Sequence, residues 1–69
     1  MTQITVTLNG ETRQIPPELT LYGLLEHLDL DPRKVAVERN LEIAPRDQYP
    51  AIRIQPDDRL EIVHFVGGG

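Results

Sequence analysis

The residues with the clearest chemical potential stand at the end of the sequence, where Val66 is followed by Gly67, Gly68 and Gly69. Glycine has no side chain, so the reactive group that this segment offers is the α-carboxylate of Gly69. Such a carboxylate has a reference pKa of about 3.5, is ionised at neutral pH and is a poor electrophile. ATP activates it by adenylation, because AMP then leaves when sulfur or an amine attacks the acyl carbon. We therefore predict that Gly69 is covalently modified through an acyl-adenylate.

The glycine run also suits delivery of a carboxylate to a distant active site. Three residues span about 10 Å at roughly 3.4 Å per residue, and they fit a channel that any Cβ would block. We expect residues 66–69 to form a flexible tail in which Val66, Gly67 and Gly68 thread the active site of a partner. A frayed terminus or an engineered remnant has the same composition, and both interpretations stay open.

Metal sites are excluded by residue type and spacing. The segment Asp29 to Asp31 begins like a calcium loop, but Lys34 occupies the glycine position and Asn40 the position of the closing glutamate. His27 and His64 are far apart in the sequence, and cysteine is absent, so no zinc site is predicted.

Catalytic side chains are also missing from the sequence. There is no serine or cysteine to act as a nucleophile. The neighbouring carboxylates of Asp57 and Asp58 are typical of a turn, where such side chains accept hydrogen bonds from the local backbone. We predict no catalytic residue, no bound cofactor and no metal, and hence a protein that is not itself an enzyme.

Length and charge restrict the class of protein further. A chain of 69 residues forms one small domain that buries only about 60% of its unfolded surface. The formal charge of −4 disfavours nucleic acid as a partner. No apolar run approaches the roughly 20 residues that a bilayer requires, and the first residues do not resemble a signal peptide. We expect a cytoplasmic protein without a membrane partner.

The first half of the sequence predicts a hairpin followed by a helix. Apolar and polar residues alternate over residues 4–8, Asn9-Gly10 is typical of a type I′ turn, and residues 11–15 form the returning strand. From Thr20, a fair N-cap, leucines at positions 21, 24, 25 and 28 form one helical stripe. We expect Asp31-Pro32 to end the helix, and we expect Gly23 to allow another backbone to approach.

The second half predicts further strands around an irregular connection. Residues 34–39 and 59–66 alternate as strands, and a short edge strand is expected near residues 41–43. Three prolines interrupt residues 44–56, a stretch that we expect to contact the core through Ile43, Tyr49, Ile52 and Ile54. The last strand is apolar on both sides, which favours a central position beside the first strand.

These elements indicate an α+β fold, because one helix can cover only one face of a sheet. We predict a single β-grasp domain over residues 1–69, with a mixed sheet of four or five strands packed on one helix and the tail at residues 66–69. On the uncovered face, Ala36, Val63 and Phe65 would form an apolar patch for partner binding. The same residues also fit an ordinary sheet surface.

Several segments resemble the ThiS family of sulfur carrier proteins, which are ubiquitin-like. They are ITVTLNGE, TLYGLLEHL, VAVERNLEIAPR and DRLEIVHFVGGG, which together span nearly the whole chain. Two details depart from the family pattern: Asp57 stands where a glycine precedes the aspartate, and Tyr49-Pro50 stands where tryptophan is frequent. Both lie in the connection and leave the tail unaffected.

The resemblance implies a function in thiazole formation for thiamine. An E1-like adenylyltransferase of the ThiF type would use ATP to adenylate Gly69, and a cysteine desulfurase would indirectly supply sulfur. The thiocarboxylate would then donate that sulfur to a thiazole synthase of the ThiG type. A carrier for molybdopterin synthesis or transfer-RNA thiolation, a protein modifier joined through Gly69, and an interaction module with an inert tail remain alternatives.

Overall fold

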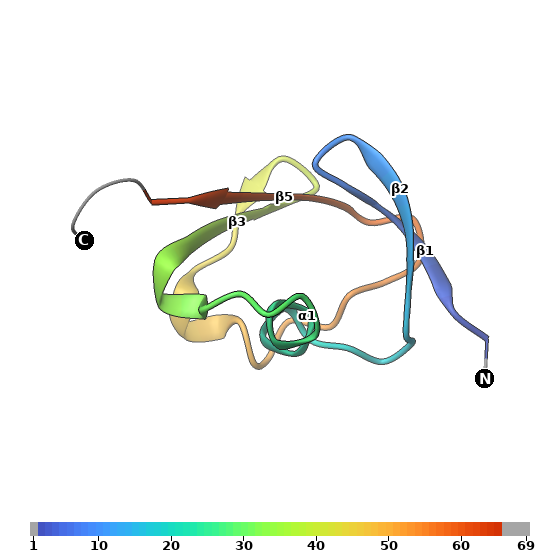
Figure 1. Ribbon diagram of the computed structural model, residues 1–69, viewed down its shortest axis with the longest axis horizontal. Coiled ribbons are helices and arrows are strands. Elements are labelled where there is room, and N and C mark those ends of the chain that lie inside the picture. The colour runs from blue at the N-terminus through green and yellow to red at the C-terminus, as the bar shows by residue number, and fades with distance from the viewer. Residues whose placement is uncertain (1, 66–69) are drawn as a thin grey trace.

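The computed structural model describes residues 2–65, which form a five-stranded sheet and one α-helix (Figure 1). The strands are β1 (Ile4–Leu8), β2 (Glu11–Ile15), β3 (Val35–Arg39), β4 (Glu42–Ile43) and β5 (Arg59–His64), and the helix is α1 (Leu21–His27). Two 3₁₀ turns, η1 (Pro32–Lys34) and η2 (Arg46–Gln48), lie in the connections. The predicted tail at residues 66–69 lies outside the described residues.

The sheet has the order β2-β1-β5-β3-β4, so β5 is central as its apolar sequence predicted. It pairs parallel with β1 and antiparallel with β3, which confirms the mixed sheet. The β1–β2 hairpin turns at Asn9 and Gly10, whose φ angles of 49° and 82° are those of the predicted type I′ turn.

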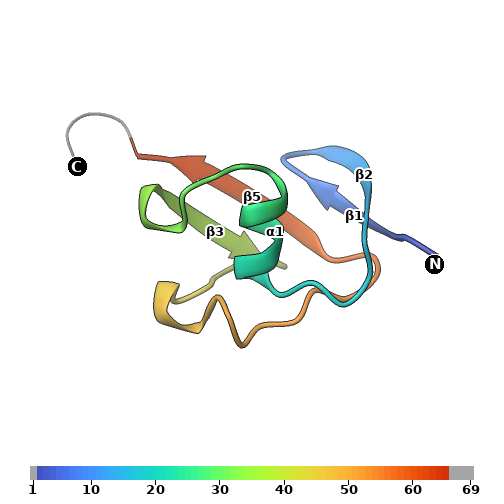
Figure 2. The same ribbon diagram turned by 60° about the horizontal axis from the view of Figure 1, so that its bottom comes forward.

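Helix α1 crosses one face of the sheet (Figure 2), and no other described element covers the opposite face (Figure 1). Its first turn is capped as predicted, because Thr20 Oγ1 accepts a hydrogen bond of 3.0 Å from the Gly23 N–H. The side chains of Leu21, Leu24 and Leu25 are buried against the sheet. The leucine stripe therefore supplies the helical half of the core.

Two expectations about the helix are wrong. The helix ends at His27, before Pro32, because Asp29 adopts a left-handed φ of 61°. Pro32 instead begins η1, where its fixed φ suits a first position. No backbone approaches Gly23: the nearest atoms to an added Cβ belong to the side chains of Leu19 and Thr20, at 3.4 Å.

The connection between β4 and β5 is irregular and packs on the core, as expected. Tyr49 and Ile54 are buried, and Ile52 is partly buried. The expectation for Ile43 is wrong, because its side chain is 75% exposed. It lies opposite Glu38 in the β3–β4 register, and this position turns it toward the uncovered face.

Asp58 fixes the turn that precedes β5. Its carboxylate accepts hydrogen bonds from the Gln55 N–H at 2.8 Å, Arg39 Nε at 2.9 Å and Asn40 Nδ2 at 3.0 Å. The predicted role of Asp58 in the local turn is thus confirmed, and the same carboxylate also ties that turn to the end of β3. Asp57 adopts a φ of 70°, which is consistent with its position at a site where the family pattern has glycine.

Candidate functional site: the uncovered sheet face and the end of β5

The three residues of the predicted patch lie together on the uncovered face. Ala36 and Val63 are direct cross-strand partners, and Phe65 follows Val63 by two residues. The side chains of Val63 and Phe65 are 60% and 52% exposed, whereas Ala36 is half-buried. The predicted orientation of the strands is therefore confirmed, and the role of this apolar patch in partner binding stays a prediction.

Ile43 enlarges the patch in a way that the sequence interpretation missed. Because it pairs with Glu38 on β3, it lies diagonally across from Ala36, two residues earlier on that strand. Such diagonal neighbours are about 7–8 Å apart. The sequence of β4 did not indicate this orientation, because a strand of two residues is too short to show an alternation of apolar and polar positions.

Two carboxylates border the patch. Glu38 and Glu61 are direct cross-strand partners, an arrangement in which like charges repel. Within residues 2–65, neither takes part in an ion pair. The uncovered face therefore combines exposed apolar side chains with negative charge, and a basic, partly apolar surface would complement it.

Arg46 connects the edge of the sheet to the residue after β5. The sequence interpretation did not identify it as part of the site. Its Nη2 donates a hydrogen bond of 3.2 Å to the carbonyl oxygen of Val35, the first residue of β3. Its guanidinium carbon lies 5.3 Å from the centroid of the Phe65 ring, a cation–π distance. The sequence feature that could have pointed to Arg46 is its position directly after Ala44-Pro45, where strand β4 has ended.

Phe65 is itself held by the backbone ladder. Its N–H donates a hydrogen bond of 3.0 Å to the carbonyl oxygen of Lys34, just before β3. Phe65 is the last described residue, so this bond and the Arg46 contact are the last described constraints before the tail. The four predicted tail residues, Val66, Gly67, Gly68 and Gly69, lie outside the described part of the chain.

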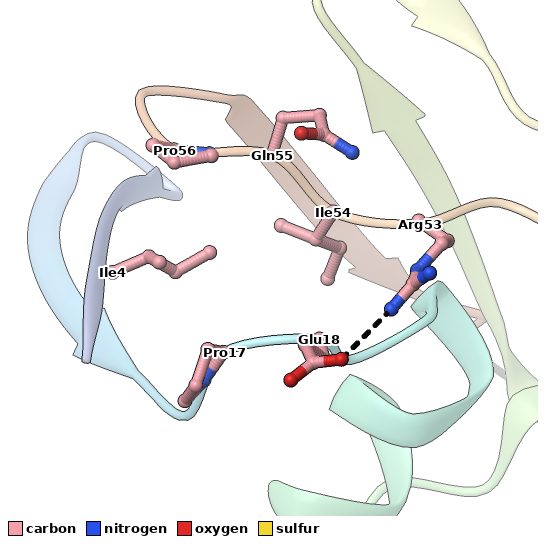
Figure 3. A pocket seen from close by; sticks show the side chains of 7 residues that line it. All are labelled: Ile4, Pro17, Glu18, Arg53, Ile54, Gln55 and Pro56. Atoms are coloured by element: carbon pink, nitrogen blue, oxygen red, sulfur yellow. Dashed lines mark hydrogen bonds and ion pairs between the residues drawn. The ribbon is translucent and has the colours of Figure 1, made fainter. Parts of the chain in front are cut away.

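A pocket among the described residues lies near the start of β1, away from the end of β5 (Figures 1 and 3). Its apolar lining comes from Ile4, Ile54 and two prolines. Its two charged lining residues, Glu18 and Arg53, form an ion pair of 3.4 Å with each other (Figure 3). The two charged side chains that line the pocket therefore contact each other.

The range of residues 2–65 holds no group of three or more His, Asp or Glu side chains able to bind a metal ion. His27 and His64 are both exposed. None of the helices in the described range is long and apolar enough to cross a bilayer.

The sheet order, the single helix and the exposed face define a ubiquitin-like β-grasp protein. A crystal structure of the thiamine biosynthesis protein ThiS from Geobacter metallireducens superimposes with a TM-score of 0.83 at 29% identity, covering 96% of this chain and 100% of that one. A designed protein based on human erythrocytic ubiquitin matches with a TM-score of 0.53 at 22% identity, covering 100% of this chain and 98% of that one, and supports the fold alone.

The sequence comparisons identify the family. The model of the ThiS family matches residues 6–69, and the chain belongs to that family. The sulfur carrier protein ThiS of Bacillus subtilis is 44% identical over 50 residues, which are 72% of this chain and 76% of that protein. The thiazole synthase of Paramagnetospirillum magneticum is 48% identical over 64 residues, or 93% of this chain. The chain spans only one fifth of the length of that relative.

Proposed function

We propose that this chain is a sulfur carrier for thiazole formation in thiamine biosynthesis and that Gly69 carries the sulfur. The observation on which the proposal rests is the family match, which extends through residues 67–69 and so includes the glycine run. The name of the Bacillus relative, a sulfur carrier protein, supports the same function. In this role the chain is a co-substrate and not a catalyst.

The proposed chemistry has two steps at the Gly69 carboxylate. A carboxylate oxygen attacks the α-phosphorus of ATP, pyrophosphate leaves, and an acyl-adenylate forms. A thiol reductant releases sulfide from the persulfide that a desulfurase forms with the sulfur of cysteine. This sulfide then attacks the acyl carbon and AMP leaves, so that a C–S bond replaces the C–O bond to AMP. The chain contains no cysteine, so no internal thiol competes for the activated acyl group. ATP is bound by the partner adenylyltransferase.

Two partner classes follow from this chemistry. An E1-like adenylyltransferase would contact the apolar patch of Ala36, Val63 and Phe65 while residues 66–69 enter its active site. A thiazole synthase would accept the sulfur. The relatives named thiazole synthase support the second partner. In each of them, a segment that makes up 20% of the length matches this chain, so a carrier-like segment is part of a protein that is named for the synthase.

Intact mass spectrometry tests the modification. The chain is incubated with ATP, an E1-like adenylyltransferase, a cysteine desulfurase, cysteine and dithiothreitol, the thiol that reduces the desulfurase persulfide. We expect the mass to rise by the difference between sulfur and oxygen, and we expect this gain to disappear when Gly69 is deleted or when one residue is added after it.

The control is the fold of both tail variants, measured by circular dichroism, which we expect to be unchanged. A mass gain that survives deletion of Gly69 would contradict the proposal. A ladder of larger protein adducts would instead indicate a modifier, and an unchanged mass would indicate an interaction module.

A further inference from the structure

Arg46 occupies a position where one side chain makes contact with β3 and with the residue that follows β5. The carbonyl of Val35 points away from β5, toward the β4 side of β3. Strand β4 does not reach Val35, because it pairs with Glu38 and Arg39. Further along that edge, the Ala44 N–H bonds the carbonyl of Val37 at 2.9 Å. The guanidinium of Arg46 continues this edge by donating to Val35 at 3.2 Å.

The other contact of Arg46 is with Phe65, the residue that follows β5. Its guanidinium lies over the Phe65 ring at 5.3 Å, while the Phe65 N–H is bonded to Lys34. The ring and the backbone of Phe65 are therefore held from two directions, at the residue immediately before the tail. A planar guanidinium can donate in its own plane and stack on a ring at the same time, which an ammonium cannot do.

We propose that Arg46 is a positioning residue that clamps Phe65 and thereby fixes the position of the last described residue before residues 66–69. This inference rests on the proposed function, because a fixed origin matters only if the Gly69 carboxylate must reach a nucleotide. A tail with a fixed origin spends a larger fraction of its time in the productive position once the carrier is bound. Arg46 thus acts on the adenylation rate through Phe65, without touching the reacting atoms.

The test compares Arg46→Gln with Arg53→Gln, which removes the same charge from the segment that is bridged to Thr20, the N-cap of α1. Among residues 2–65, the ion-pair partner of Arg53 is the exposed Glu18, and the Arg53 side chain is 59% exposed. Pyrophosphate release by the adenylyltransferase is measured as a function of carrier concentration. We expect Arg46→Gln to lower kcat about two- to fivefold, the factor that an exposed cation–π contact is worth. Its KM is expected to stay within about twofold of the wild-type KM, whereas the loss of a docking contact would change KM by more. Arg53→Gln is expected to change neither value.

A conservative variant and an independent measurement complete the design. Arg46→Lys keeps the charge and one donor but loses the stacked plane, so its kcat is expected between those of the wild type and Arg46→Gln. Amide hydrogen exchange of the Phe65 N–H, followed by NMR, is expected to quicken in Arg46→Gln and not in Arg53→Gln. Circular dichroism confirms that each variant is folded.

The outcomes separate the clamp from the proposed function. A raised KM with unchanged kcat would overturn the inference, because Arg46 would then be a docking contact, and unchanged kcat would overturn it as well. If the wild-type chain is not adenylated at all, the proposed function fails, and the Phe65 exchange rate alone decides the clamp. Faster exchange in Arg46→Gln then supports the clamp, and unchanged exchange overturns it.

Discussion

At the scale of single residues, Phe65 separates surface binding from stability. Its ring is half exposed on the uncovered face, and its described contacts are the Arg46 guanidinium and the Lys34 carbonyl. We expect Phe65→Asp to weaken binding to the adenylyltransferase strongly, since a charge replaces the largest apolar side chain of the patch. The free energy of unfolding is expected to fall by only about 1 kcal/mol, the value of an exposed cation–π contact.

The matched control for Phe65→Asp is Tyr22→Asp. Tyr22 is 40% exposed but lies on α1, on the opposite side of the sheet. Binding titrations and urea unfolding measure both quantities for the two variants. A stability loss of about 3 kcal/mol or more in Phe65→Asp, the cost typical of a core aromatic, would show that Phe65 belongs to the core.

At the scale of elements, the β1–β2 and β3–β4 hairpins form turns with similar φ angles from different residues. The β1–β2 turn uses Asn9 and Gly10, with φ angles of 49° and 82°. The β3–β4 turn uses Asn40 and Leu41, with φ angles of 53° and 72°. A left-handed φ costs an L-residue roughly 1–2 kcal/mol, and the Leu41 side chain is 77% exposed, so burial gives little in return.

We therefore expect Leu41→Gly to raise the free energy of unfolding by up to about 1 kcal/mol, measured by urea denaturation. Gly10→Ala is the matched reverse change, since nothing lies within 4 Å of its added Cβ and only the backbone is affected. It is expected to destabilise by a similar amount. A loss of stability in Leu41→Gly would mean that the leucine packs against the fold more closely than its exposure indicates.

At the scale of the whole molecule, Asp58 links the stability of the sheet to pH. Burial raises the pKa of this carboxyl, but hydrogen bonds from the Gln55 backbone, Arg39 and Asn40 more than offset burial, so its pKa lies below the ordinary value. A group whose pKa is lowered by folding stabilises the folded state above its unfolded pKa, which is about 3.9 for aspartate. That contribution is lost as the pH falls through the folded pKa.

The expected result is a free energy of unfolding that declines below about pH 4, with a weaker decline in Asp58→Asn. At neutral pH we expect Asp58→Asn to cost about 1–3 kcal/mol, because an amide cannot accept all three hydrogen bonds. Asp31→Asn is the control: the pKa of Asp31 is also lowered, by its hydrogen bonds with Arg33, but that pair is exposed and screened. Urea unfolding between acidic and neutral pH measures all three proteins. An equal decline in the wild type and Asp58→Asn would contradict this assignment.

The periodic segments were predictable from the sequence, whereas single contacts were not. Alternation placed Val63 and Phe65 on the uncovered face, and the leucine stripe located α1, because period is a local property of the chain. The orientation of Ile43 was mispredicted, since it depends on the β3–β4 register. The end of α1 was mispredicted because Asp29 takes a left-handed φ that proline spacing does not reveal.

The sequence by itself determined the β-grasp class, the central last strand and the glycine run that the proposed function requires, because hydrophobic period and residue type act over short distances along the chain. Only the tertiary structure decided that Arg46 meets both Val35 and Phe65, and that Asp58 joins Arg39 and Asn40. These contacts join residues 11 to 19 positions apart, and packing of the sheet, which no local pattern encodes, brings them together.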